Sequence, residues 1–511
     1  MWQFFLDFYG YAVFFYSLGL IISYVVLMIL AYRGLFQSTD NMVDDYAYRV
    51  VERSPYTPGV SIVAPAYNEE KTVVDNIKSL LKQKYPKFEV VIVNDGSKDS
   101  TLETMITNFD MVPVDFAYVE YLQTKPFKRL YRSTNPLYEK LIVVDKENGG
   151  TKADPINTGI NVASYDYFIN TDVDCILTED AIYQCMLPVM RHNNVIAVSG
   201  MMTMSNGCDI ENGEIKKLAP PSDPIPLWQE LEYLRSFFVG KMGWSAINAM
   251  SNVSGGFGLF DRRIVLKAGG YSADSFAEDM DVLLRMMGYC CENDIDYRVV
   301  QVSKICARTE GPGDVKNLKR QRTRWGRGLF QTFDRHFKKV ANPTYRRVGL
   351  ITLPYILVFE FMAPVIEIVG MITVVYLAFT GGVNWPSAVV IFSAIYIFGF
   401  MLSLVTLLYA YKSKTTYTKL SHYLRLAVAA LLEPVLYHPL LTFFSINGYI
   451  NYLRGTKAVW VAIARKGYAS KPGENPAPPT AGAEKVSGGI DNVVDETVEP
   501  LAEPTSPTAN A

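Results

Sequence analysis

The sequence predicts an α/β domain built on a parallel sheet and combined with membrane-spanning helices. Short apolar strands alternate with amphipathic helices between residues 59 and 339, a pattern typical of parallel sheets with helical crossovers. Long apolar runs flank this region on both sides. Acidic residues follow the strands, most clearly in residues 165–181 (YDYFINTDVDCILTEDA), and strand ends are where open α/β sheets bind ligands.

Residues 8–32 form the first apolar run. They carry almost no charge and are long enough to cross a bilayer as a helix of about 20 residues. A cleavable signal peptide is not expected, because the run lacks a basic leading segment and a small-residue cleavage site. Asp7 precedes the run and Arg33 follows it, so the positive-inside bias places the following domain in the cytoplasm.

The first two strands are predicted at residues 60–65 and 89–93, with a helix over residues 68–83 between them. Two such units imply a ligand crevice at the carboxyl ends of parallel strands. Asp95 directly follows the second strand and is expected beside this crevice. The alternative is an aspartate that only caps a helix or a turn.

Asp172 and Asp174 follow another predicted strand. The period of two along a strand would aim both carboxylates the same way. A hard cation such as Mg²⁺ or Mn²⁺ takes carboxylate oxygens and completes its shell with ligand phosphates. The alternative is two solvated aspartates that open the turn into the next helix.

Two glycine-rich turns are candidate ligand contacts. The turn at residues 147–154 delivers Lys152, which suits a diphosphate as a mobile point charge. The alternative is a surface lysine. In residues 254–258 side chains are nearly absent, so a sugar ring could approach the backbone at Gly255 and Gly256. A tight turn without a ligand is the alternative.

Glu278, Asp279 and Asp281 begin a predicted helix. The helix dipole favours acids at this end. A carboxylate crowded by others can also have a raised pKa, which makes this cluster the source of a candidate general base.

Residues 319–327 (KRQRTRWGR) form a basic helix with one tryptophan. Gln321, Arg324 and Trp325 share one face of it. That face would suit a diphosphate clamped by arginine and a sugar ring stacked on the indole. The alternative is a helix that touches anionic lipid headgroups, which is also expected of Arg320, Arg322 and Arg327.

The C-terminal part holds further apolar segments. Residues 348–379 and 388–411 are expected to cross the membrane as a pair. Glu360 and Glu367 share a face of the first, which should line a polar path or pack on a basic group. Residues 423–453 are predicted as a broken re-entrant or interfacial element, with a full crossing as the alternative.

The predicted domains are residues 8–32, 59–339, 346–467 and a disordered tail at 471–511.

Composition excludes several classes of protein. The 511 residues carry a net charge of −2, which gives no reason to expect nucleic-acid binding. The six cysteines form no C-x-x-C pair, as expected for free cytosolic thiols. With only four histidines, a His-rich zinc site is not expected.

Seven motifs occur in a fixed order: AYNEE, VNDGS, NGGTKAD, DVD, SGGFGLF, AED and QRTRW. With this set the chain, over about residues 61–467, resembles the membrane-bound inverting family 2 glycosyltransferases, which include bacterial poly-N-acetylglucosamine, hyaluronan, chitin-oligosaccharide and cellulose synthases. The resemblance implies a GT-A catalytic domain facing the cytoplasm of a multi-pass cell-membrane protein, with a UDP-sugar as the usual donor.

The resemblance also implies roles for individual residues. Tyr67, Glu69 and Asp95 would hold the uridine, and Lys152 would help to bind the nucleotide. Asp172 and Asp174 would bind it through Mg²⁺ or Mn²⁺. The residues implied at the reacting sugars are Asp279 as the base beside Glu278, Gln321 and Arg324 at the donor phosphates, and Trp325 with Gly255 and Gly256 at the acceptor.

Two departures from the family pattern stand out. Ala277 occupies the place of the usual Thr or Ser before Glu-Asp, and residues 459–467, with Trp460, are only similar to the segment that the resemblance implies closes over the donor.

Three functions are compatible with these motifs. The first is a synthase that extends a β-linked polysaccharide and threads it outward, with membrane lipids and export proteins as partners. The second is transfer of a single sugar to a lipid acceptor. The third is an inactive scaffold that binds nucleotide.

Overall fold

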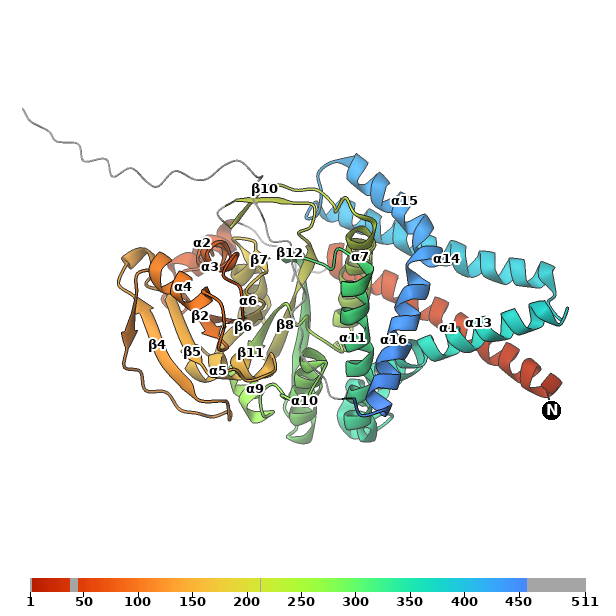
Figure 1. Ribbon diagram of the computed structural model, residues 1–511, viewed down its shortest axis with the longest axis horizontal. Coiled ribbons are helices and arrows are strands. Elements are labelled where there is room, and N and C mark those ends of the chain that lie inside the picture. Colours follow the sequence, from red (N-terminus) through yellow and green to blue (C-terminus); the bar gives the residue numbers. More distant parts are fainter. Residues whose placement is uncertain (1, 37–44, 212, 457–511) are drawn as a thin grey trace, which may run out of the picture. The chain divides into compact units, whose positions relative to one another are not determined.

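The computed structural model describes residues 2–36, 45–211 and 213–456 (Figure 1). Its centre is a ten-stranded sheet in the order β3-β4-β5-β2-β1-β6-β11-β8-β12-β7. The strands are β1 Val60–Ala66, β2 Phe88–Asn94, β3 Met111–Val114, β4 Phe127–Ser133, β5 Leu141–Lys146, β6 Tyr167–Thr171, β7 Ile176–Leu177, β8 Val195–Met204, β11 Phe257–Asp261 and β12 Arg298–Thr309, with a separate hairpin of β9 Asp209–Glu211 and β10 Glu214–Lys217.

The sheet is mixed, whereas the sequence predicts a parallel one. β1 pairs in parallel with β2 and β6, and β2 with β5, as expected for strands joined by helices. The exception at the centre is β11, which is antiparallel to both β6 and β8. This strand brings the turn at Gly255 and Gly256 to the same edge at which β6 ends.

Both faces of the central strands are buried. Every residue of β2 and of β5 is buried, and β1 has one partly exposed residue, as apolar runs of parallel strands require when helices cover both faces. The helices around the sheet are α2 Asp45–Arg53, α3 Val73–Leu81, α4 Thr101–Asn108, α5 Ala153–Val162, α6 Ala181–Arg191, α9 Arg262–Lys267 and α10 Glu278–Glu292.

The helix predicted over residues 68–83 is shorter than expected. Asn68 has φ of 57°, a left-handed conformation that cannot begin a right-handed helix. The α3 helix therefore starts at Val73, and residues 67–72 remain in a loop after β1.

Among the described residues, three helical segments are long and apolar enough to cross a membrane: Gly10–Phe36 within α1 Trp2–Phe36, then Val348–Phe379, and Trp385–Ser413, which is α14. The second contains π-helical turns, as η6 Val348–Thr352, α12 Leu353–Ile356, η7 Leu357–Phe361 and α13 Ala363–Phe379. Pro354 and Pro364 begin its α-helical parts, because proline interrupts the hydrogen bonds of the preceding turn.

The segment predicted to be broken contains two helices, α15 Leu420–Leu436 and α16 His438–Leu453, which meet at 51°. The predicted break is present, and the re-entrant path stays a prediction. Residues 459–467 and the tail at 471–511 lie outside the described residues.

Helices α7 Pro224–Arg235 and α11 Val315–His336 lie between the sheet and the apolar helices (Figure 1). The chain continues from α7 through the π-helical turn η3 Ser236–Lys241 into α8 Met242–Ala246. From α7, Arg235 pairs with Glu433 of α15 and donates to Ser403 of α14. The indole of Trp228 donates to the carbonyl of Ala429 at 3.0 Å. Helix α7 therefore joins the sheet domain to the apolar helices through polar contacts.

Helix α11 packs on α16 at two glycines. A Cβ on Gly448 would lie 2.4 Å from the carbonyl oxygen of Thr323, and one on Gly326 would lie 2.6 Å from that of Ser445. The two backbones can approach this closely only because neither residue has a side chain. This contact fixes the position of α11 against α16.

Replacing Glu433 by Ala should destabilise the protein, because it leaves the Arg235 guanidinium largely buried without its carboxylate. Breaking such a pair costs on the order of 3 kcal/mol, which would appear as a lower melting temperature of the purified protein in detergent. The double variant Arg235→Met/Glu433→Leu should recover most of the loss. A double variant no more stable than the single one would contradict this account.

Candidate active site

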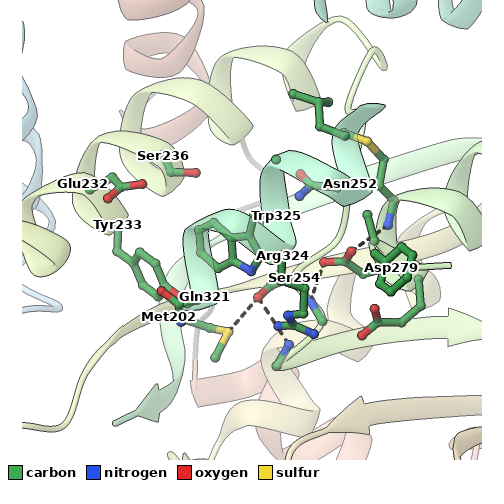
Figure 2. Close-up of a pocket in the computed structure, with 18 of the residues that line it drawn as sticks. Met202, Glu232, Tyr233, Ser236, Asn252, Ser254, Asp279, Gln321, Arg324 and Trp325 are labelled. Carbon is green, nitrogen blue, oxygen red and sulfur yellow. Dashed lines mark hydrogen bonds between the residues drawn. The ribbon is translucent and has the colours of Figure 1, made fainter. Parts of the chain in front are cut away.

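A cavity of about 430 Å³ lies where the sheet, α10, α11 and the apolar helices meet. It gathers side chains from segments that are far apart in the sequence (Figure 2). The predicted residues that line it are Lys152, Asp172, Gly255, Gly256, Glu278, Asp279, Gln321, Arg324 and Trp325.

Four predicted residues are not among the described residues that line this cavity: Tyr67, Glu69, Asp95 and Asp174. Tyr67 and Glu69 lie in the loop after β1, and Asp95 follows β2. The paired registers of β2, β1 and β6 place these loops along the same carboxyl edge of the sheet as Asp172. They extend the edge beyond the cavity.

Asp95 is buried beside the glycine turn. It accepts hydrogen bonds from the backbone N–H of Gly149 at 2.9 Å and from the Lys146 ammonium at 3.2 Å. Burial raises the pKa of Asp95 above its usual value, although the Gly149 and Lys146 bonds oppose the shift. Asp95 thus holds the turn that leads to Lys152, which agrees with the turn-capping alternative, and its contact with a ligand stays a prediction.

Asp172 and Asp174 stand just beyond β6, and each offers a carboxylate oxygen within 4.8 Å of the other and of the Cys175 thiol. Two carboxylates at this separation fit a hard divalent cation. The thiol was not anticipated from the sequence, and as a ligand it would favour a softer ion. Asp174 is buried whereas Asp172 faces the cavity.

Lys152 reaches the same place from the glycine turn. Its ammonium pairs with Asp172 and donates to the carbonyl of Gly255 at 2.8 Å. Burial opposes its charge, but the carboxylates of Asp172 and Glu278 raise the pKa of Lys152 overall. The lysine is therefore part of the charged centre of the cavity rather than a surface residue.

Asp279 is held by two backbone groups. Its Oδ2 accepts the N–H of Gly255 at 3.0 Å, and its Oδ1 accepts the N–H of Met280 at 2.8 Å. A Cβ on Gly255 would lie 3.2 Å from the Asp279 carboxylate, and one on Gly256 would lie 3.6 Å from that of Asp172. The two glycines thus contact the candidate base on one side and the candidate metal ligand on the other.

Glu278 differs from its neighbour because it is buried. Burial raises the pKa of Glu278, and the positive charge of Lys152 opposes the shift. Asp279, whose carboxylate stands at the cavity with two donors, is the better placed of the two to accept a proton.

Gln321, Arg324 and Trp325 line one wall of the cavity from α11 (Figure 2). The side-chain oxygen of Gln321 is buried and has no hydrogen-bond partner among the described residues. Since a buried amide oxygen is costly without a donor, this atom is well suited to a ligand.

The expectation that Arg322 touches lipid headgroups is wrong. Arg322 is only 6% exposed and makes two bonds to Glu232, at 2.5 and 2.8 Å. Its guanidinium also lies 4.2 Å from the centre of the Trp325 ring. Burial opposes the charge, but Glu232 raises the pKa of Arg322. This arginine therefore fixes the indole, whereas Arg320 is exposed.

The cavity extends to the apolar helices, where it is lined by Glu360, Pro364, Ser445 and Tyr449. The two acids were expected to line a polar path or to pack on a basic group, and each does one of the two. Glu360 lines the cavity, and Glu367 accepts bonds from His438 at 3.0 Å and from Thr442 at 2.5 Å. Sequence reasoning missed the lining residues Glu232, Tyr233, Ser236, Lys241, Ser445 and Tyr449, which belong to no motif.

Two family models match the chain. The model for glycosyl transferase family 2 matches residues 61–109 and 125–261, and that for glycosyl transferase family group 2 matches residues 228–412. Together they include all of the residues that line the cavity except Ser445 and Tyr449.

Curated relatives include poly-beta-1,6-N-acetyl-D-glucosamine synthases. One from Staphylococcus epidermidis is 26% identical over 321 residues, which are 63% of this chain and 65% of the relative. One from Staphylococcus aureus (strain COL) is 29% identical over 308 residues, 59% of this chain and 60% of the relative. The match spans less than two thirds of the length of these two relatives.

Among solved structures, a mannosyltransferase from Pyrobaculum calidifontis in complex with GDP-Man and Mn²⁺ has a TM-score of 0.48 and 16% identity, covering 85% of this chain and 99% of that one. Residues 1–349 of TarS from S. aureus, in complex with UDP-GlcNAc, give a TM-score of 0.32 and 17% identity, covering 55% of this chain and 73% of that one.

Lys241 gives the cavity a measurable pH dependence. Burial lowers the pKa of Lys241 to about 8, and the charge of Asp279 opposes the shift. Below pH 8 the folded protein holds a charged, poorly solvated ammonium, so Lys241→Met should raise the melting temperature there. The gain should shrink as the pH rises from 8 towards the usual lysine value of about 10.4, where the folded and unfolded chains both lose the proton. Thermal melts across this range test it.

The exposed Lys71 provides the control. Lys71→Met should leave the melting temperature almost unchanged at every pH. A Lys241→Met variant whose gain does not vary with pH, or which is destabilised throughout, would contradict the burial argument.

Proposed function

Because the chain belongs to glycosyl transferase family 2, we propose that it is an inverting glycosyltransferase that extends a β-linked polysaccharide at the membrane. The expected donor is a nucleotide sugar, most simply a UDP-sugar. The observation that carries the proposal is the single cavity in which Asp172, Asp279 and Arg324 meet Trp325. The fold class is the α/β GT-A domain with apolar helices that the sequence predicts.

The donor would lie along the carboxyl edge of the sheet. Tyr67, Glu69 and Asp95 would hold the uridine, since their loops follow the adjacent strands β1 and β2. Lys152, Gln321 and Arg324 would contact the diphosphate, two as cations and one through its amide. The order of these loops leads from the nucleoside towards the reacting sugar inside the cavity.

Asp172 and Asp174 would hold a Mg²⁺ or Mn²⁺ ion, to which their carboxylate oxygens are suited. The ion would offset the negative charge that develops on the leaving diphosphate. Arg324 would stabilise the same charge from the opposite element, α11.

Asp279 would take the proton from the acceptor hydroxyl as that oxygen attacks the anomeric carbon. The bond to the diphosphate breaks on the opposite face, so an α-linked donor yields a β-linkage. The two backbone N–H bonds hold the carboxylate in one orientation, which fixes its approach to the acceptor. Glu278, buried beside it, would adjust the local charge.

The acceptor would stack on Trp325, whose indole is fixed by Arg322, with Gly255 and Gly256 beneath the sugar ring. The cavity continues past Glu360 and Tyr449 among the apolar helices, which favours a growing glycan that leaves through the membrane. We further propose that the protein spans the cell membrane several times with the sheet domain in the cytoplasm.

Purified protein in lipid should therefore release UDP from one member of a UDP-sugar panel and place radiolabelled sugar in high-molecular-weight material. Asp279→Asn should abolish this turnover because it removes the proton acceptor, while nucleotide binding by calorimetry persists. The exposed Asp115 serves as a control, since Asp115→Asn should retain full activity. Label found only in lipid extracts would establish the lipid acceptor instead, and nucleotide binding without any turnover would indicate an inactive scaffold.

Metal dependence gives a separate test. Asp172→Asn should raise the Mn²⁺ concentration needed for half-maximal activity by at least about tenfold. Even residues that only orient the ligands of a metal lower its affinity by about this factor when they are replaced. Mn²⁺ titrations of the nucleotide-bound protein by electron paramagnetic resonance should show the same shift. The exposed Asp166, six residues upstream, should tolerate the same change to Asn. Full activity in the presence of EDTA would rule out the metal.

A further inference from the structure

The loop at residues 272–277 leads directly into α10, whose second residue is the candidate base Asp279. Helix α11, which supplies Gln321, Arg324 and Trp325 to the cavity, packs along this loop. Arg324, Gly328 and Gln331 are spaced i, i+4 and i+7, so they lie on one face of α11. The first of them reaches the cavity and the other two reach the loop.

Both polar atoms of the Gln331 side chain bond to the backbone of this loop. Its Oε1 accepts the N–H of Phe276 at 2.9 Å, and its Nε2 donates to the carbonyl of Asp274 at 2.7 Å. Gln331 is 8% exposed and is not among the described residues that line the cavity. An amide that satisfies both a donor and an acceptor of one loop holds that loop in a single conformation.

Two further contacts hold the same segment. A Cβ on Gly328 would lie 2.8 Å from that of Ala277 and 2.9 Å from its nitrogen, so α11 touches the loop without a side chain between them. The Arg327 guanidinium lies 4.1 Å from the centre of the Phe276 ring. The small Ala277, which departs from the family pattern, is the residue on which Gly328 packs.

Past the base, α10 is fixed to the end of α11. His336 contacts the Asp281 carboxylate at 3.0 Å, and Arg285 contacts it at 2.9 Å. Burial opposes the charge on Asp281, but its bonds to His336 and Arg285 lower its pKa. The carboxylate therefore anchors the helix and is not a second base.

We propose that Gln331 is a positioning residue for the sugar transfer, one that sets the distance between the base Asp279 and the donor-binding residues of α11. This proposal rests on the proposed function. Gln331 touches neither substrate, yet it joins the loop before the base to the helix that carries Arg324 and Trp325. Misplacement of a catalytic group by about 1 Å can lower a rate about a hundredfold, so loss of these two bonds should affect the chemical step.

The decisive variant is Gln331→Met, which has a similar length and can form neither bond. We expect kcat to fall by roughly 10- to 100-fold, with donor affinity by calorimetry and the donor KM unchanged. The control is Gln184→Met, because Gln184 is also buried and hydrogen-bonded but lies in α6, away from the cavity. That control should keep the wild-type kcat.

Gln331→Glu adds a second measurement, the pH dependence of kcat, which should not change if Gln331 has only a structural role. Its carboxylate can still accept the Phe276 N–H, but it can donate to the Asp274 carbonyl only when protonated. Its kcat should therefore recover relative to wild type as the pH falls towards 5, at an unchanged melting temperature. This variant also decides the matter if Gln331→Met does not fold.

A Gln331→Met enzyme with wild-type kcat overturns the proposal. So does a parallel loss of kcat, donor affinity and melting temperature in both variants, because that pattern indicates a structural residue. If the wild-type protein transfers no sugar from any donor, the proposed function itself fails, and this outcome is recognised before any variant is measured.

Discussion

The close contact of α11 with its neighbours on two sides is the constraint on which the site depends. Gly326 lets the backbone of α16 approach, and Gly328 lets the loop before Asp279 approach. In the turn just before these glycines, the helix presents Arg324 and Trp325 to the cavity. One rigid element thus sets the positions of the base, the donor contacts and the apolar helices relative to one another, which is the precision that transfer between two sugars requires.

Two cations at and beside the cavity are balanced locally. Lys152 pairs with Asp172, and Arg322 pairs with Glu232, so each of these two has a carboxylate beside it. Uncompensated charge would be costly in a partly buried cavity. The Arg322 pair has a second consequence, because the same guanidinium stacks on the Trp325 ring. The indole is thereby preorganised as a flat surface before a sugar arrives.

Much of the site could be predicted from the sequence because its chemistry is local. Asp172 follows a strand, Asp279 lies in the first turn of a helix, and Gln321 and Arg324 share one face of a helix. The spacing along the sequence is therefore enough to place each residue at the end or on the face of its element. The role of Arg322 could not be predicted in this way. The sequence of a basic helix next to an apolar segment is the same whether its arginine faces lipid or a carboxylate 90 residues upstream. Only the tertiary structure shows that Glu232 lies beside Arg322.

The fold could likewise be predicted where local sequence patterns determine it, and not where it depends on the path of the chain. The buried runs of β1 and β2 identify their own strands, whereas the reversed direction of β11 follows from a chain path that no strand pattern encodes. That reversal matters for the chemistry. Because β11 runs antiparallel to β6, the turn before it, at Gly255 and Gly256, reaches the carboxyl edge where Asp172 lies. A parallel strand at this place would have ended at the edge instead of starting there, and the backbone N–H of Gly255 would not orient Asp279.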